Sequence, residues 1–318
     1  MPTVSVVIPV KDGAGYIAEA LRSILAQDLA DIEVIVVDDG SRDESVTIAG
    51  SLAAGDGRVR IVSNRGSGIV DALNMGIALA RAPLVARMDC DDVCEPSRLR
   101  LQAERFATDA DLQLLGSAGL AIDGAGRPLG AIEVPFEDRL IREAFATHNP
   151  VLHPTAMFRT GTVRKLGGYR RAFTYAEDYD LWMRLSGTGR MANMEARLVR
   201  LRAHAAQTSK TKRDRQKAAA AFARQSAARH LPGAEPFDAA ALPDQAIGAF
   251  LAWRAAEGRA IGHGECRDIE LLLRMPGLPG ALARKLLLLA AVGAPSFRTL
   301  ALAPRLAWHR LATRLAIR

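Results

Sequence analysis

Three groups of acidic residues have the types and spacing that could do chemistry. The first, Asp89-Cys-Asp-Asp92, directly follows an apolar run at residues 84–88. Alternating carboxylates in a tight turn can present two oxygen ligands to one hard divalent cation and leave other coordination positions for phosphates and water. Such a turn can also cap the helix that follows it, so the residues alone leave both interpretations open.

The other two groups have the same double interpretation. Asp38 and Asp39 end a second apolar run, where a carboxylate could accept hydrogen bonds from a nucleobase ring N–H or a ribose hydroxyl. Turns that begin with Asp are also common for structural reasons. Glu177 and Asp178 precede the amphipathic residues 179–185. A carboxylate at this helix start can take a proton from an acceptor hydroxyl, or it can cap the helix.

Alternating strand and helix patterns place two of these groups at one edge of a sheet. The predicted strands are residues 4–10, 33–38, 59–63 and 84–88, and the predicted helices include residues 16–27 and 69–80. Strands that alternate with helices form a parallel sheet with helices on both faces, and ligands gather at the carboxyl ends of the strands. Asp39 and Asp89 both follow such ends.

The rest of the chain has a less regular pattern and then a change in composition. The predicted elements are a hairpin at residues 112–122 and 128–134, a helix at 137–146, a helix starting near Ala176 and a strand at 197–202. Beyond about residue 208 the chain becomes Ala- and Arg-rich, with a helical pattern that prolines interrupt. The predicted domains are therefore residues 1–208 and a C-terminal α-helical region at residues 209–318.

The net charge of +7 is concentrated in the C-terminal region, because residues 274–318 carry eight Lys or Arg and no Asp or Glu. A general nucleic-acid binder spreads basic residues among stacking aromatic residues, and only 5% of this chain is aromatic. We therefore expect no nucleic-acid partner. The basic amphipathic residues 281–318 are expected either to lie on an anionic membrane surface or to pack against the first domain or a second subunit.

Cysteine content and hydropathy favour a cytoplasmic protein. Cys90, Cys94 and Cys266 cannot form a fully paired disulfide framework and lack the repeated spacing of a zinc site. The chain begins with a strand-like run that has no signal-peptide pattern. No apolar run reaches the roughly 20 residues that span a bilayer. We expect a cytoplasmic location, with peripheral contact on the inner face of the cytoplasmic membrane if residues 281–318 bind lipid.

Six stretches, taken in order, resemble the family 2 glycosyltransferases with the GT-A fold. The resemblance covers residues 3–208, and the shared order and spacing make it more specific than any single stretch. This chain departs from the family at Lys11, where an aromatic residue often continues the first strand. The matching stretches are residues 4–10 (VSVVIPV), 33–41 (EVIVVDDGS), 86–92 (ARMDCDD), 153–155 (HPT), 167–169 (GGY) and 177–182 (EDYDLW).

The resemblance implies a fold and an activity. The fold would be α/β of the GT-A type, a mainly parallel twisted sheet flanked by helices, with a C-terminal helical extension. The activity would be inverting, metal-dependent transfer of one sugar from a nucleotide diphosphate sugar, UDP- or dTDP-linked. The acceptor would be a hydroxyl of a glycan or a lipid-linked intermediate in the synthesis of a cell-surface polysaccharide.

The resemblance also implies site residues. Asp178 would be the general base with Glu177 beside it, and the metal, Mn²⁺ or Mg²⁺, would be held by Asp91 and Asp89, with His204 near it. Candidate donor-nucleotide contacts are Pro9, Val10, Asp12, Asp39, Arg65, Gly68 and Asp89. For Arg65 and Gly68 a solvated loop is the alternative interpretation.

Two other classes of function stay open on the sequence. A dinucleotide oxidoreductase shares an alternating α/β start, but it requires a Gly-x-Gly-x-x-Gly turn after the first strand, where residues 9–15 read PVKDGAG. A non-catalytic module that binds nucleotide sugars or glycans is the second alternative. Carboxylates at both the metal and the base positions argue against it.

Overall fold

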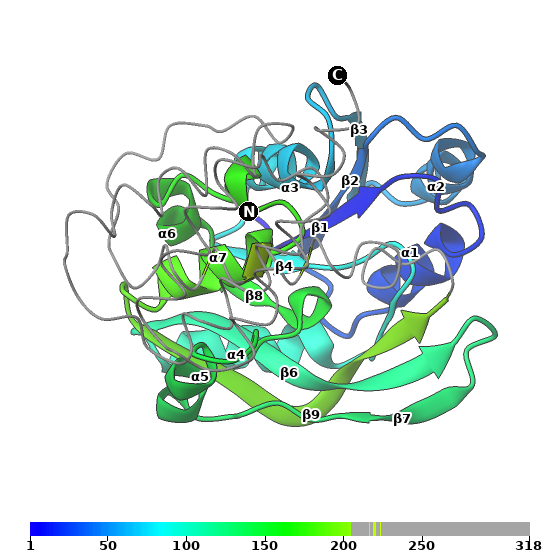
Figure 1. The fold of residues 1–318 in the computed structure, drawn as a ribbon. Coiled ribbons are helices and arrows are strands. Elements are labelled where there is room, and N and C mark those ends of the chain that lie inside the picture. The colour runs from blue at the N-terminus through cyan, green and yellow to red at the C-terminus, as the bar shows by residue number, and fades with distance from the viewer. Residues whose placement is uncertain (205–215, 217–218, 221–222, 224–318) are drawn as a thin grey trace, which may run out of the picture. The chain divides into compact units, whose positions relative to one another are not determined.

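The structure, a computed structural model, describes residues 1–204, 216, 219, 220 and 223 (Figure 1). All described elements except η2 belong to one compact unit, made of Met1–Arg170 and Glu177–Thr211. The elements are β1 (Val4–Val10), α1 (Ile17–Leu25), β2 (Ile32–Asp38), α2 (Ser45–Ala53), β3 (Val59–Ser63), α3 (Ile69–Leu79), β4 (Leu84–Arg87), β5 (Val93–Cys94), α4 (Arg98–Thr108), β6 (Leu112–Asp123), β7 (Pro128–Ile132), α5 (Asp138–Ala144), η1 (His153–Thr155), β8 (Met157–Arg159), α6 (Thr160–Lys165), η2 (Arg171–Phe173), α7 (Glu177–Leu185) and β9 (Arg190–Ala203).

The first part of the sheet is parallel because β1 and β2 are apolar on both faces. Every residue of these two strands is buried, which requires helices on both sides. β1 pairs in parallel with β2 and β4, and β2 pairs in parallel with β3. On one face Ile8 shares a core with Leu21 of α1, and on the other Val7 meets α3 at Gly76.

The second part of the sheet is mixed. β8 pairs antiparallel with β4 and β6, β7 pairs antiparallel with β6, and β9 runs parallel to β6 and antiparallel to β5. The nine described strands form one sheet in the order β3-β2-β1-β4-β8-β6-β9-β5, with β7 on β6 (Figure 1). β1, near the N-terminus, and β9, which ends at Ala203, therefore belong to the same sheet, so segments far apart in sequence come together.

The predicted α/β architecture is confirmed. Residues 4–10 and 59–63 form β1 and β3 as predicted, and the predicted hairpin is the β6–β7 pair. β9 begins at Arg190, seven residues before the predicted strand at 197–202, because it pairs with β6 along most of its length. η1 and β8, which were not predicted, connect β4 to β6.

The predicted helical region 209–318 lies outside the described residues, apart from residues 216, 219, 220 and 223. The domain boundary near residue 208 and the membrane contact of residues 281–318 therefore stay predictions. None of the described helices combines the length and the apolar character needed to cross a bilayer.

Candidate functional site

The carboxyl ends of β1, β2 and β4 gather most of the predicted site residues. These strands are parallel neighbours, so the loops after Val10, Asp38 and Arg87 leave the sheet at the same edge (Figure 1). The loops are tied together by the backbone, since the N–H of Asp39 donates to the Val10 carbonyl at 2.8 Å. This edge is where ligands bind in open α/β sheets.

Asp39 is held in a defined orientation by the loop before α3. Its Oδ1 accepts from Asn64 Nδ2 at 2.7 Å and from the Gly68 N–H at 2.8 Å, and its Oδ2 lies 3.4 Å from Lys11 Nζ. Gly68 has a φ of 88°, a conformation that favours glycine. The structure thus brings Asp39 and Gly68 together, while Arg65 is exposed in the same loop.

β1 and the loop after it contribute two buried residues to the site and one carboxylate that holds a neighbouring loop. Pro9 and Val10 are buried at the end of β1. Asp12, which has a φ of 51°, accepts from the Arg42 N–H at 2.8 Å, so its carboxylate fixes the loop that follows β2. A nucleotide contact by Asp12 stays a prediction.

The turn after β4 forms a compact carboxylate cluster. Asp89, Asp91 and Asp92 each offer an oxygen, and these oxygens lie within 4.8 Å of one another. Burial raises the pKa of Asp89 despite the opposing charge of Arg87. Burial, with the charges of Asp89 and Asp91, also raises the pKa of Asp92 well above its usual range. The cluster therefore concentrates negative charge that water does not fully solvate.

His204 completes the cluster from the end of β9. Its Nε2 lies 2.8 Å from Asp91 Oδ2, and its ring packs 5.0 Å from that of Tyr16. Ligand atoms of one octahedral cation at about 2.1 Å lie about 3 Å apart, so this pair has a spacing that one metal ion could share. The three carboxylates supply the oxygen ligands that suit Mg²⁺ or Mn²⁺. The residues present therefore fit a divalent cation.

Asp178 lies at the first turn of α7 with both carboxylate oxygens engaged. Oδ1 accepts from the Tyr179 N–H at 2.7 Å and Oδ2 accepts from Asn149 Nδ2 at 2.7 Å. Burial raises the pKa of Asp178 to about 6, although these hydrogen bonds and the charge of Arg87 lower it. A carboxyl with this pKa can be ionised at neutral pH and still accept a proton. Glu177 is buried beside it, with 8% of its surface exposed.

Arg87 contacts the carboxylate cluster and acts on Asp178 through its charge. Arg87 is 4% exposed, and its guanidinium forms an ion pair with Asp89. Its positive charge also lowers the pKa values of Asp178 and of the buried His153. The charge of Arg87 thus acts both on Asp89, a predicted metal ligand, and on Asp178, the predicted base.

Sequence reasoning missed several residues that shape this site. Asp92 stands in the acidic turn but was not assigned to the metal, and His153 stands in a matching stretch without a role. Asn64 follows a predicted strand, where polar residues often meet ligands. Arg87 also stands in a matching stretch without a role, although its ion-pair partner Asp89 is only two residues away. Asn149 has no local signal, because its partner Asp178 comes from another element.

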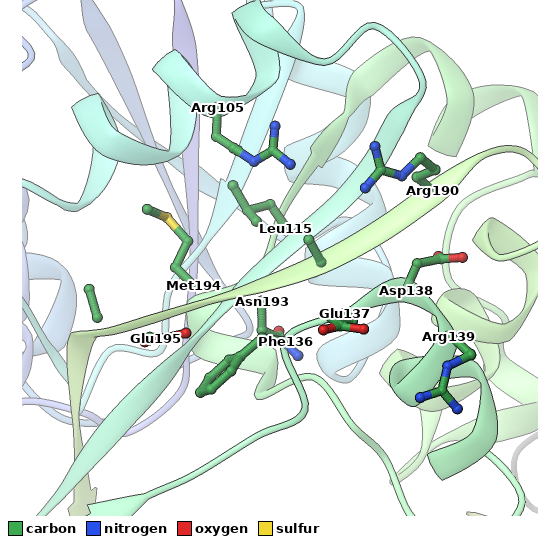
Figure 2. Close-up of a pocket in the computed structure, with 12 residues that line it drawn as sticks. Arg105, Leu115, Phe136, Glu137, Asp138, Arg139, Arg190, Asn193, Met194 and Glu195 are labelled. Carbon is green, nitrogen blue, oxygen red and sulfur yellow. The ribbon is translucent and has the colours of Figure 1, made fainter.

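A pocket of about 690 Å³ is lined by none of these residues (Figure 2). α4, β6, β9 and the start of α5 line it, and it contains no predicted site residue. Its labelled charged side chains are Arg105, Glu137, Asp138, Arg139, Arg190 and Glu195. Since basic and acidic groups are equally represented, this rim selects no ligand by charge.

Comparison with known families and proteins gives consistent matches. A family model described as Glycosyl transferase family 2 matches residues 5–166. An uncharacterized glycosyltransferase of Haemophilus influenzae is 32% identical over 219 residues, which are 65% of this chain and 68% of the relative. A chondroitin synthase of Escherichia coli is 29% identical over 217 residues, which are 68% of this chain but 31% of the synthase.

Solved structures with a similar fold also match. Staphylococcus aureus TarS 1–349 in complex with UDP-GlcNAc has a TM-score of 0.59 and 17% identity, over 89% of this chain and 83% of that chain. The mannosyltransferase PcManGT of Pyrobaculum calidifontis, in complex with GDP-Man and Mn²⁺, has a TM-score of 0.53 and 19% identity, over 92% and 86%. At these identities the likeness is one of fold.

Proposed function

The chain belongs to glycosyl transferase family 2, and from this premise we propose that it is an inverting, metal-dependent enzyme that adds one sugar per encounter to an acceptor hydroxyl. It is a glycosyltransferase with the GT-A fold. The donor class, the metal, the acceptor and the residue roles below are the content of the proposal.

The proposed donor is a nucleotide diphosphate sugar with uracil or thymine as its base. Asp39 Oδ1 is occupied by Asn64 and Gly68, which leaves Oδ2, beside the exposed Lys11, to accept from the ring N–H of a pyrimidine. Pro9 and Val10 would line the base. Asp12, Arg65, Gly68 and Asp89 are the further proposed donor contacts. The structure of TarS with UDP-GlcNAc supports this donor class.

The proposed metal site consists of Asp91, Asp89 and His204, with Mn²⁺ or Mg²⁺ as the ion. Support comes from the clustered carboxylates and from the Mn²⁺ in the PcManGT complex. A divalent cation bound there would offset the negative charge that develops on the departing diphosphate. Arg87 holds Asp89 in place from the protein side.

Asp178 is the proposed general base, with Glu177 beside it. The acceptor oxygen forms a bond to the anomeric carbon while the bond from that carbon to the diphosphate oxygen breaks. The proton passes to Asp178, and the electron pair leaves with the nucleoside diphosphate. One base facing one leaving group gives a single in-line displacement, which inverts the anomeric centre. The observation that carries this proposal is the cluster of Asp89, Asp91 and Asp92 after β4, together with the carboxylate of Asp178, which two hydrogen bonds orient at the start of α7. The raised pKa of Asp178, about 6, supports its role as a base.

The proposed acceptor is a hydroxyl of a glycan or of a lipid-linked intermediate in polysaccharide synthesis. The chondroitin synthase relative supports a glycan acceptor, although this chain spans 31% of that protein. A place at the inner face of the cytoplasmic membrane, through residues 281–318, rests on the basic charge of that segment.

Substitution of Asp178 tests the proposal. Asp178→Asn removes the base but keeps the size of the side chain, so transfer should fall about 10²- to 10⁴-fold while binding of UDP with Mn²⁺ persists. Transfer is measured as nucleoside diphosphate release with an acceptor present, and binding as a thermal shift. Glu195→Gln, at an exposed acid on β9, is the matched control for loss of a carboxylate charge. An Asp178→Asn enzyme with near-normal turnover would remove Asp178 from this role.

A further inference from the structure

A chain of side-chain contacts leads from α3 to Asp178. It runs through two stretches that have no role in the mechanism above, residues 153–155 and 167–169. Both backbone groups of Tyr169 are clamped by Asn74, since the Tyr169 N–H donates to Asn74 Oδ1 at 2.8 Å and Asn74 Nδ2 donates to the Tyr169 carbonyl at 2.8 Å. Gly168 permits this approach. Its φ is 70°, and a Cβ there would lie 2.3 Å from Asn74 Oδ1. The clamp therefore fixes the backbone of Tyr169, from which its side chain extends.

His153 is the next group in this array. Its Nε2 lies 2.9 Å from the Tyr169 hydroxyl, and its ring packs against both the Tyr169 and the Trp182 ring, with centroid distances of 5.5 and 5.8 Å. η1 holds His153 in place because Thr155 Oγ1 accepts from the Ser117 N–H at 3.0 Å and donates to a backbone carbonyl at 2.8 Å. The imidazole is thus oriented from both sides.

The hydrogen bond to Tyr169 decides which ring nitrogen of His153 carries the proton. Tyr169 is 2% exposed, and burial raises its pKa well above 10, so the hydroxyl keeps its proton and needs an acceptor. His153 Nε2 supplies that acceptor. Burial, with the charge of Arg87, lowers the pKa of His153 well below 6.5, so the ring is neutral and its one proton is on Nδ1. The N–H of Nδ1 is therefore the donor that this array presents to Asp178.

We propose that His153 Nδ1 and Asp178 Oδ2 together form the subsite that holds the acceptor hydroxyl, an inference that rests on the proposed function. The two atoms lie 3.9 Å apart, too far for a direct hydrogen bond. An oxygen about 2.8 Å from each atom bridges them. It donates its proton to Asp178 and accepts from His153, which aims its remaining lone pair at the donor sugar. His153 is then an acceptor-binding residue, and Tyr169 is a positioning residue that acts through it.

This subsite selects a chemical class of acceptor. A hydroxyl has one donor and two acceptor sites, so it can satisfy Asp178 and His153 at the same time. An ammonium group has no acceptor site and leaves the N–H of Nδ1 without a partner, which is costly in a buried site. The acceptor is therefore a neutral alcohol and not an amine.

Kinetics of the full-length enzyme test the subsite. With UDP-GlcNAc and Mn²⁺ as donor and octyl β-glycosides as acceptor probes, His153→Ala should lower kcat/KM for the acceptor about tenfold and leave the donor KM unchanged. His153→Asn should restore most of the loss, because its amide nitrogen takes the place of Nδ1. Tyr169→Phe should give a smaller loss, and His148→Asn, at an exposed histidine, should give none. An unchanged acceptor kcat/KM in His153→Ala overturns the proposal.

A measurement without turnover tests the same arrangement. In ¹⁵N spectra of full-length protein labelled at histidine, the resonance that His153→Asn removes identifies His153. We expect a neutral ring protonated on Nδ1 at pH 7, with a shift toward Nε2 protonation in Tyr169→Phe. A ring protonated on Nε2 or on both nitrogens overturns the inference.

Different results refute the proposed function and the acceptor subsite. Equal activity of wild type and Asp178→Asn refutes the proposed function. An inactive Asp178→Asn beside a fully active His153→Ala refutes the acceptor subsite alone.

Discussion

At the carboxyl group of Asp178, burial and hydrogen bonding act in opposite directions. Burial raises the pKa to about 6, and the Tyr179 N–H, Arg87 and Asn149 lower it. A base has to be ionised to accept a proton, so kcat/KM should fall about tenfold per pH unit below about pH 6 and level off above it. Initial rates at saturating Mn²⁺ between pH 5 and 8 measure this profile. A flat profile would contradict the role of Asp178.

A measurement of unfolding is the control for this pH dependence. As the pH falls, the contribution of Asp178 to the unfolding free energy should rise, whereas the activity should fall. The pKa of Asp178 is raised above its unfolded value of 3.8, so the folded state binds more protons between about pH 4 and 6. The contribution of this group to the unfolding free energy therefore rises as the pH falls through about 6. Loss of activity in that range would not come from unfolding driven by Asp178.

The types of the acidic residues could be predicted from the sequence, but their partners could not. Asp39, Asp91 and Asp178 each follow or begin a recognisable element, which is a local signal. The partner of Asp178, Asn149, is 29 residues away in sequence, and Arg87 reaches Asp178 only through the electrostatics of the folded chain. Such long-range contacts depend on strand order, which periodicity does not encode.

Among the elements, α3 packs on the sheet through a glycine. A Cβ at Gly76 would lie 2.3 Å from Val7 Cγ1 of β1. Gly76→Ala should therefore lower the unfolding free energy by about 1–3 kcal/mol, even though alanine is the better helix former. Urea unfolding of the full-length protein measures the change.

Gly50 in α2 is the matched control for Gly76. A Cβ there would meet no atom within 4 Å, so Gly50→Ala should raise the unfolding free energy by up to about 1 kcal/mol. If both substitutions changed stability in the same direction, the close packing of α3 on β1 would not explain the effect at Gly76.

Helices and strands with a strong local hydrophobic pattern could be predicted, and those without one could not. The apolar run that became β1 predicted its bounds, because a buried strand in a parallel sheet is apolar on both faces. The bounds of β3 were also predicted, although β3 is an edge strand and none of its residues is fully buried. β8 has three residues, too few for any period to be visible. The first half of β9 contains Asn193 and Glu195, so its strand character comes from pairing with β6 and not from its composition.

For the whole molecule, ligand binding and folding are linked. A ligand that binds the folded chain alone raises the unfolding free energy by about 2.7 kcal/mol at a concentration of 100 times its Kd. Burial and mutual repulsion raise the pKa values of Asp89 and Asp92, which means that their ionised forms destabilise the unliganded fold. A bound cation would offset this repulsion between the carboxylates. We expect Mn²⁺ with UDP to raise Tm by about 5 °C, more than either ligand alone.

Asp91→Asn is the control for the metal in this experiment. It should abolish the part of the Tm increase that depends on Mn²⁺ and leave the smaller effect of UDP, since Asp39 and its partners remain. If UDP gave the same increase in EDTA as in Mn²⁺, metal dependence would be refuted.

The pairing of β9 has a consequence for how the protein is made. β9 ends at Ala203 and lies between β6 and β5 in the sheet, so both of these strands present unpaired backbone until it has been synthesised. Ribosomes extend a chain at about 5–20 residues per second, and an open strand edge is a template for aggregation during that interval. The residues matched by the family model end at 166, before β9 begins. A nascent chain of that length has unpaired strand edges on β5 and β6 that can aggregate. A fragment of this enzyme made for expression should therefore extend past residue 203.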